Sequence, residues 1–313
     1  MPAIFSTAPG KAILFGEHAV VYGQPAIAIP VTQLKAKAVV QALPLATTGT
    51  IHIEAPDINL DSDLSQLPQT NPHAMAIQLV LDTFNINKPP SFLLRITSKI
   101  PVASGLGSGA AVAVATIRAL SNFLGQPLED VQVCSLAFEI EKLHHGTPSG
   151  IDNTVITYAK PVYFIKGQPI EILSPTKSFT ILIADTGVSK ATSETVAQVH
   201  AAWRANPSEY EVIFNNIGEI SKTAYSAINA GKLKLLGQLM DQNQNQLSEM
   251  DLSSPELDKL IQSAKEAGAL GAKLSGGGQG GNMLALVDES NQASVQSALK
   301  NAGAASVFST TIP

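Results

Sequence analysis

A short glycine-rich segment restricts the fold more than any other part of this sequence. The residues SGLGSG at 104–109 lie between a strand-like run at 91–97 and an alanine-rich helical pattern at 109–124. Glycines allow backbone N–H groups to approach phosphate oxygens, and a helix N-terminus attracts anions. The segment lacks the lysine that follows the last glycine of a Walker A loop. The sequence therefore predicts either a phosphate-holding loop made of backbone or an ordinary turn before a helix.

Strand and helix patterns alternate along the 313 residues, a length typical of two domains of about 150 residues each. In the helix expected at 128–145, one apolar stripe is predicted to contain Val131, Cys134, Leu136, Ile140 and Leu143. The other predicted elements of the first half are strands at 12–15, 25–30, 36–43, 50–55 and 91–97 and helices at 73–84 and 109–124.

The second half begins with a buried-looking strand at 180–185, and we place a domain boundary just before it, giving domains 1–178 and 179–313. Long helices are predicted at 208–231 and 232–250, followed by a helix–strand–strand–helix–strand order to the end. Strands and helices mixed in this order predict an α+β fold with a sandwich in the second half.

Composition excludes several classes of function. The 20 basic and 25 acidic residues form no long runs, which argues against a general surface for nucleic acid or anionic membranes. A single cysteine, Cys134, excludes an internal disulfide and a cysteine-rich metal cage. No apolar stretch of about 20 residues could span a bilayer, and no secretory signal pattern is present. We therefore expect a cytoplasmic protein.

The N-terminal segment 8–28 carries Lys11 six residues before the pair Glu17 and His18. A fully extended strand would separate Lys11 from Glu17 by about 20 Å, so the two can share a site only if the chain bends at Gly16. The alternative is a surface lysine and a solvated Glu–His pair in a hairpin loop.

A third segment of interest covers residues 138–158. We expect one helix to end at Gly146 and Ser149 to cap a second helix that carries Asp152. Ser149 and Asp152 could form a capping box, which is a purely structural role. The turn could also bring Asp152 close to Glu141, so that one carboxylate holds Mg²⁺ and the other handles a proton.

The fourth segment, KLSGGGQGGNML at 273–284, contains five glycines between residues 276 and 281. Such density between two apolar runs implies that the backbone closely approaches another group. The alternative is a flexible hairpin.

Together and in this order, four motifs resemble the GHMP kinase superfamily and, within it, the mevalonate kinase family. The joint occurrence of the motifs over nearly the full chain is specific, whereas a single one would not be. They are PGKAILFGEHAVVYG at 9–23, PVASGLGSGAA at 101–111, HGTPSGIDN at 145–153 and KLSGGGQGGN at 273–282. Galactokinases continue differently after Gly-Glu-His, and phosphomevalonate kinases commonly have tyrosine where His18 stands here.

The resemblance implies the GHMP kinase two-domain fold. Its N-terminal domain would be ribosomal protein S5 domain 2-like, and its C-terminal domain would be a ferredoxin-like α/β sandwich. The implied reaction, in a cleft between the domains, is Mg-ATP-dependent phosphorylation of the C5 hydroxyl of (R)-mevalonate in isoprenoid biosynthesis. The residues implied to bind the ATP phosphates are Ser104, Gly105, Leu106, Gly107, Ser108, Gly109 and Ala110.

The resemblance also implies the roles of individual side chains. Asp152 matches the catalytic base, Lys11 matches the lysine that stabilises developing charge, and Glu141 matches the carboxylate that binds Mg²⁺. The family usually has a second serine where this chain has Gly109, so Ser108 or a water would complete the metal shell. The residues that match the substrate side are Glu17, His18, Ser149 and Thr192, and the C-terminal loop contributes Gly276, Gly277 and Gly278.

Two other functions remain open at this stage. One is another GHMP small-molecule kinase, such as a phosphomevalonate kinase. The other is a non-catalytic ligand sensor, and the presence of Asp152, Lys11 and Glu141 argues against it. The expected partners are ATP and mevalonate, with no nucleic acid and no membrane. A homodimer is compatible with the resemblance, while oligomeric state, nucleotide specificity and feedback inhibition by isoprenoid diphosphates stay open.

Overall fold

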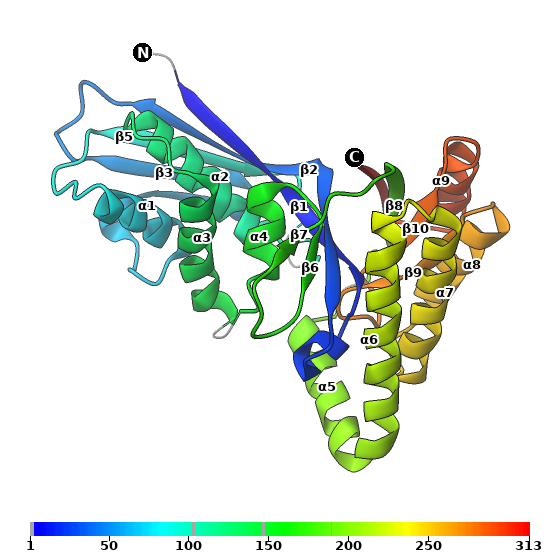
Figure 1. Cartoon of the computed structure of the whole chain (residues 1–313). Coiled ribbons are helices and arrows are strands. Elements are labelled where there is room, and N and C mark those ends of the chain that lie inside the picture. Colours follow the sequence, from blue (N-terminus) through cyan, green and yellow to red (C-terminus); the bar gives the residue numbers. More distant parts are fainter. Residues whose placement is uncertain (1–2, 102–103, 146–147, 189) are drawn as a thin grey trace. The chain divides into compact units, whose positions relative to one another are not determined.

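The structure is a computed structural model that describes residues 3–101, 104–145, 148–188 and 190–313. Its residues group into two compact units, each assembled from segments that are distant in sequence (Figure 1). Unit 1 comprises Met1–Gly10, Leu34–Pro101 and Gly107–Ala159, and unit 2 comprises Lys11–Gln33, Val102–Leu106 and Lys160–Pro313. The domain boundary at residue 178 stays a prediction.

A mixed sheet has the strand order β4-β3-β5-β2-β6-β7, and β1 pairs with β2. β3 and β5 run parallel, whereas β2 pairs antiparallel with both β5 and β6. The strands are β1 Ile4–Phe15, β2 Ala26–Ala42, β3 Ile51–Ala55, β4 Leu60–Asp63, β5 Phe92–Ser98, β6 Val162–Phe164 and β7 Glu171–Ile172. Short 3₁₀ turns occur at Ala19–Tyr22, Pro56–Ile58 and Leu64–Gln66.

β2 is one strand of 17 residues where the sequence predicted two. It pairs with β6 through residues 26–28 and with β5 through residues 36–42. Pro30 lies between these two paired segments, so its missing N–H group interrupts neither ladder. The predicted separation into strands at 25–30 and 36–43 was therefore wrong.

Unit 1 gathers four helices on one side of its strands (Figure 1). Helix α2 is central, because it packs against the other three helices and against β5. Its alanine-rich sequence suits this position, since small side chains allow several neighbours to approach closely. The helices are α1 Pro72–Thr83, α2 Ser108–Phe123, α3 Asp130–His145 and α4 Ile151–Tyr158.

The buried face of α3 differs from the predicted stripe. Val131 is 66% exposed and Leu143 is 40% exposed, so the prediction was wrong for both. The buried positions follow the i, i+4, i+7, i+8 spacing of one helix face, and a charged residue occupies the last of them. These buried residues are Val133, Ala137, Ile140 and Glu141.

Unit 2 contains a four-stranded antiparallel sheet in the order β11-β8-β10-β9. Along the chain its elements read β–α–β–β–α–β, and β10 lies between β8 and β9. This split arrangement is the ferredoxin-like topology, so the predicted fold class is confirmed. The strands are β8 Phe179–Asp185, β9 Gly271–Ser275, β10 Asn282–Val287 and β11 Ser306–Ile312.

The core of unit 2 is formed where the inner residues of β8, β9 and β10 pack against its helices. Helix α5 was not predicted, because half of its residues are polar and it buries few residues, among them Thr195 and Val199. The helices are α5 Thr192–Ala205, α6 Pro207–Asn229, α7 Leu233–Glu249, α8 Pro255–Glu266 and α9 Gln292–Asn301.

Helix α7 covers β9, which is an edge strand of the sheet. The helix comes close because Gly237 and Gly271 meet, and a Cβ atom on Gly271 would lie 2.0 Å from the Gly237 oxygen. The side-chain oxygen of Gln244 accepts a hydrogen bond at 2.8 Å from the N–H of Leu274 in β9. The edge of the sheet is thereby closed to pairing with another strand.

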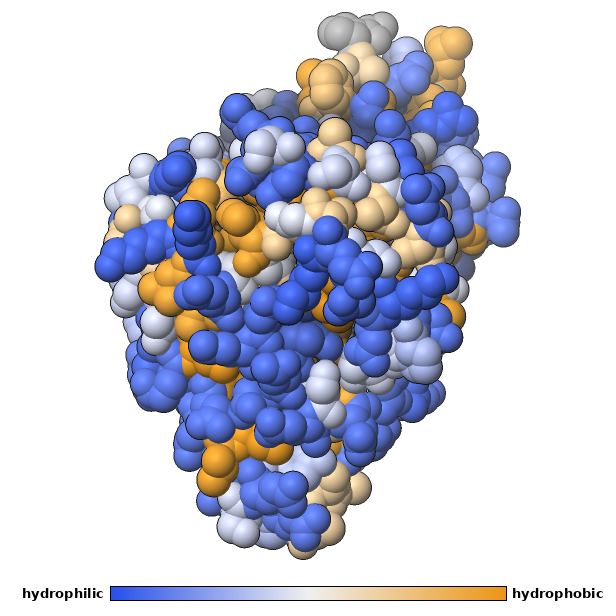
Figure 2. Space-filling view, turned by 90° about the vertical axis from the view of Figure 1, so that its right-hand side faces the viewer, coloured by the Kyte–Doolittle hydropathy of each residue, from blue (hydrophilic) through white to orange (hydrophobic). Residues whose placement is uncertain are grey.

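Among the described residues, no helix is both long and apolar enough to cross a membrane. The side of the molecule that carries α8 and α9 is largely hydrophilic, and its hydrophobic side chains form small separate groups (Figure 2). Small groups of this kind are ordinary on protein surfaces.

Candidate functional site

The segment 104–109 leads directly into α2, as the sequence predicted. Gly107 is the N-cap with a φ of 74°, and Ser108 is the first helical residue. No side-chain hydrogen bond caps this helix among the described residues. The first N–H groups of a helix and the positive end of its dipole favour an anion. The start of α2 therefore has the form expected for a phosphate-binding end.

The Glu141 carboxylate lies beside the first turn of α2. A Cβ atom on Gly109 would be 3.6 Å from Glu141 Oε1, and Glu141 is only 4% exposed. In the described part of the chain, no three His, Cys, Asp or Glu side chains cluster as metal ligands. Mg²⁺ commonly uses one or two carboxylates together with phosphate oxygens and water. One buried carboxylate at a phosphate-binding helix start fits this ion.

Helix α4 begins one residue later than predicted. Its N-cap is Gly150, with a φ of 88°, and the exposed Ser149 accepts a hydrogen bond from the N–H of Ile151 at 3.3 Å. Asp152 is therefore the second residue of the helix, whereas a capping box needs the third, and the predicted box with Ser149 was wrong. Gly146, the predicted end of the preceding helix, lies outside the described residues.

Lys11 belongs to β1 and is next to the segment that lacks a lysine. Its backbone N–H donates a hydrogen bond to the Leu106 oxygen at 2.9 Å. The residue is 8% exposed, so the alternative of a surface lysine was wrong.

The chain bends at Gly16, as the sequence analysis required. Its φ is 92°, and a Cβ atom there would lie 2.5 Å from the Pro25 oxygen, so only glycine fits this turn. After the bend, Glu17 is 3% exposed and His18 is 6% exposed. The alternative of a solvated Glu–His pair was therefore wrong.

His18 is the central residue of a strained γ-turn. Its φ is 59° and its ψ is −48°, and the N–H of Ala19 donates to the Glu17 oxygen at 2.6 Å. A γ-turn with positive φ is rare, and such strain persists only where surrounding contacts hold the backbone.

A hydrogen bond from the imidazole ring holds His18 in place. Its Nε2 atom lies 3.0 Å from the Gly277 oxygen, and because a carbonyl only accepts, Nε2 carries the hydrogen. Burial lowers the pKa of His18, and the bond to Gly277 opposes this shift. The imidazole is therefore neutral near pH 7.

The Glu17 carboxylate is held in a buried ion pair with Lys273. Lys273 is fully buried in β9 and also donates to the Leu274 oxygen at 2.6 Å, while Asn243 Nδ2 lies 3.4 Å from Glu17 Oε2. Burial raises the pKa of Glu17 and lowers the pKa of Lys273, and the charge of each partner opposes the shift of the other. Removing one partner would leave the other buried without compensation.

The glycine-rich segment 276–281 packs against its own chain. A Cβ atom on Gly278 would lie 2.3 Å from the Leu252 oxygen, and one on Gly277 would lie 3.3 Å from Thr192 Oγ1. The close backbone approach is thus confirmed, and the alternative of a flexible hairpin was wrong. Thr192 and His18 both lie at Gly277, so the structure brings these two predicted residues together.

Two further side chains of the β9–β10 hairpin bind the backbone of the N-terminal segment 8–28 and of the segment 104–109. Asn282 Nδ2 donates to the Ser104 oxygen at 2.7 Å, and Ser275 Oγ donates to the Ile13 oxygen at 2.8 Å. Sequence reasoning missed both residues, and Lys273 with them. The available signal was that polar residues flank a glycine run inside otherwise apolar strands.

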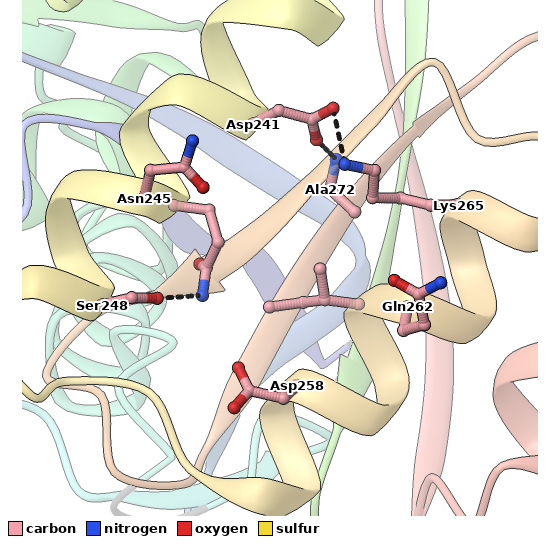
Figure 3. Close-up of a pocket in the computed structure, with 9 residues that line it drawn as sticks. Asp241, Asn245, Ser248, Asp258, Gln262, Lys265 and Ala272 are labelled. Atoms are coloured by element: carbon pink, nitrogen blue, oxygen red, sulfur yellow. Dashed lines mark hydrogen bonds and ion pairs between the residues drawn. The ribbon is translucent and has the colours of Figure 1, made fainter.

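A separate polar pocket of about 310 Å³ lies between α7, α8 and β9 (Figure 3). Asp241 pairs with Lys265 at 2.9 Å and accepts the N–H of Ala272 at 3.0 Å. None of the predicted site residues lines this pocket. Its polar groups serve to attach α7 and α8 to β9.

Comparison with known proteins identifies the family. Residues 71–160 match the family described as GHMP kinases N terminal domain, and residues 224–305 match GHMP kinases C terminal. A mevalonate kinase of Thermococcus sibiricus is 38% identical over 96% of this chain and 93% of its own length.

Solved structures agree with this assignment. L. major mevalonate kinase in complex with R-mevalonate has a TM-score of 0.85 and 29% identity, covering 98% of this chain and 95% of that one. The Methanococcus jannaschii mevalonate kinase has a TM-score of 0.86 and 27% identity, covering 99% and 98%. The chain belongs to the mevalonate kinase family of the GHMP kinases, which makes it an ATP-dependent small-molecule kinase.

Proposed function

We propose that this chain transfers the γ-phosphoryl group of ATP to the C5 hydroxyl of (R)-mevalonate, which gives 5-phosphomevalonate for isoprenoid biosynthesis. One observation carries the proposal: the similarity to mevalonate kinases extends over 96% of the chain. The side chains of the four motifs are compatible with the roles below.

The ATP phosphates are bound by residues 104–110 and the start of α2. The exposed backbone of Gly105 and the uncapped start of α2 supply N–H donors and a positive dipole end. Because the transition state of phosphoryl transfer is loose, holding the phosphates in line and stabilising their charge supplies most of the catalysis.

Asp152 accepts the proton of the C5 hydroxyl, and Lys11 stabilises the charge that develops on the transferred group. Support for the first role comes from the position of Asp152 at the start of α4, where it takes no part in a capping box. Support for the second comes from the buried Lys11 of β1, whose backbone pairs with Leu106. A base of modest strength suffices when the charge is held elsewhere.

Glu141 and Ser108 would hold Mg²⁺, and the ion would neutralise charge on the phosphates. The buried Glu141 carboxylate beside Gly109 supports this assignment. Gly109 leaves room for a water where the family usually has a serine.

Glu17, His18, Ser149 and Thr192 form the substrate side, together with Gly276, Gly277 and Gly278. His18 and Thr192 support this most directly, since both lie at Gly277. Glu17 acts indirectly, because its carboxylate is buried against Lys273.

We also propose a homodimer in the cytoplasm, with domains that divide near residue 178. Sedimentation or light scattering would decide the oligomeric state, and a monomer at working concentration would overturn that part.

A coupled ADP-release assay with Mg-ATP and mevalonate tests the function. Asp152→Asn should lower kcat by about 10²- to 10⁴-fold, the usual contribution of a general base. Asp82→Asn, at an exposed position of α1, is the matched control and should retain wild-type turnover. Turnover with phosphomevalonate instead of mevalonate would keep the fold and replace the substrate, and ATP binding without any turnover would favour a sensor.

A further inference from the structure

We propose that Lys273 is a positioning residue for the reaction. Through Glu17 it holds the γ-turn that presents the His18 imidazole to the acceptor alcohol, with Nδ1 as a hydrogen-bond acceptor. This inference rests on the proposed function. It adds a role for Lys273, the Nε2–H tautomer of His18 and a reason for the buried Glu17–Lys273 ion pair.

A closed loop of contacts within unit 2 surrounds the Glu17–His18 dipeptide. Lys273 binds the Glu17 carboxylate, Glu17 is followed by His18, and His18 binds the Gly277 oxygen. Residues 273 and 277 belong to one short segment that begins in β9 and ends in the glycine-rich turn. The two contacts therefore fix both ends of the Glu17–His18 dipeptide against the same segment.

The backbone of the Glu17–His18 dipeptide is strained. His18 has a φ of 59°, and the turn is closed by the bond from the Ala19 N–H to the Glu17 oxygen. A residue with a side chain adopts this conformation only when its surroundings determine it. Glu17 is the first residue of this turn, and its buried carboxylate is held by the ammonium of Lys273.

The contact with Gly277 fixes the tautomer of the His18 imidazole. Nε2–H donates to Gly277, so in the neutral ring Nδ1 has a free lone pair and can only accept. An alcohol substrate supplies a hydroxyl donor to such an acceptor. His18 is thus suited to orient a hydroxyl group of the acceptor, and it needs no change of protonation to do so.

Burying the Glu17–Lys273 ion pair costs desolvation free energy. Lys273 and Glu17 are both inaccessible to solvent, and buried pairs of this kind can often be replaced by neutral residues without loss of stability. Stability alone therefore gives no reason for charges here. The need to fix one geometry of the γ-turn at His18 does give a reason for a charged pair at this position.

The experiment compares Lys273→Met with the double variant Lys273→Met/Glu17→Gln. The single variant leaves a buried carboxylate without its partner and should lower the unfolding midpoint. The double variant should regain wild-type stability, yet its kcat/KM for mevalonate should stay at least tenfold low while its KM for ATP stays within twofold. Lys265→Met removes an ion pair with Asp241 outside the site and should leave the kinetics unchanged.

Nitrogen-15 NMR of the imidazoles provides a readout that needs no substrate. Among the six histidines, the His18 signal is assigned by its loss in His18→Gln. Wild-type protein should show His18 protonated at Nε2, and the double variant should show a mixture of tautomers. A wild-type His18 protonated at Nδ1 would overturn the proposal even if no Lys273 variant folds.

Wild-type kinetics and an unchanged tautomer in the double variant would likewise overturn it and leave Lys273 a purely structural role. Failure of the proposed function gives a different result. In that case the wild-type enzyme itself would not phosphorylate mevalonate, whereas the NMR signature of His18 would still be measurable.

Discussion

The two glycine-rich segments, 104–109 and 276–281, look alike in the sequence and differ in the structure. No heavy atom of the described residues lies within 4 Å of a Cβ atom placed on Gly105, but a Cβ atom on Gly278 would lie 2.3 Å from the Leu252 oxygen. In the first segment glycine leaves the backbone open to a ligand. In the second it allows the chain to pack against itself at Gly277, Gly278 and Gly280, whereas a Cβ atom on Gly276 or Gly281 would meet none of the described residues within 4 Å.

The difference shows that glycine density alone does not identify a ligand site. The surroundings of each glycine decide whether the missing side chain serves binding or packing. In the proposed site the first segment takes its positive charge from elsewhere, because it has no lysine of its own.

The largest effect should come from Lys11→Met, which tests that dependence. We expect kcat to fall by about 10²- to 10³-fold, the usual loss when one preorganised charge-stabilising group is removed. Methionine preserves most of the apolar stem, so the urea midpoint should change little. A variant that loses stability in proportion to activity would contradict the charge-stabilising role.

Gly278→Ala should cause the next largest effect, which is a loss in the free energy of unfolding. The new methyl group meets a backbone oxygen at a position with a φ of 79°, so strain and overpacking add to about 3 kcal/mol. Urea unfolding of the variant and the wild type measures this cost. A loss below about 1 kcal/mol would mean that the turn shifts easily, since a positive φ alone accounts for that much.

Gly105→Ala is the matched change in the open segment. Its φ is 74° and its Cβ atom meets no neighbour, so the cost should be about 1 kcal/mol. The KM for ATP should rise, because the methyl group intrudes where phosphate oxygens approach. The contrast between the two segments fails if this variant unfolds as readily as Gly278→Ala.

Gly109→Ser should have the smallest effect. A Cβ atom there would be in ordinary contact with Glu141 Oε1, and serine is about 0.5 kcal/mol better than glycine in a helix. We expect a slight gain in stability and a lower Mg²⁺ concentration at half-maximal rate. A metal titration that superimposes on the wild type would exclude this position from the metal shell.

Local patterns predicted most of the fold. Apolar runs identified β3, β5 and β8 to within a residue, and helical periodicity identified α1, α2, α6 and α7. The stripe on α3 was misjudged because Glu141 occupies the buried face, and a hydrophobic pattern assigns no charged residue to it. Hydrophobic periodicity therefore misses a charged functional residue that lies on the buried face of a helix.

The candidate site was predictable where a motif is continuous in sequence. The bend at Gly16 and the start of α2 follow from local glycines. The pairing of Glu17 with Lys273 does not, because it depends on how β9 is placed beside the N-terminal turn. The γ-turn at His18 was equally unpredictable, since nothing local favours a positive φ on histidine.

The Glu17–Lys273 pair also has a consequence for biosynthesis. The two residues are 256 positions apart, and ribosomes add about 5–20 residues per second, so Glu17 is made about 13–50 s before its partner. During this interval the nascent chain carries a carboxylate without the ammonium that its buried position requires. Unit 2 can therefore complete its core only after β9 has been made, and Glu17 reaches its final environment long after its own synthesis.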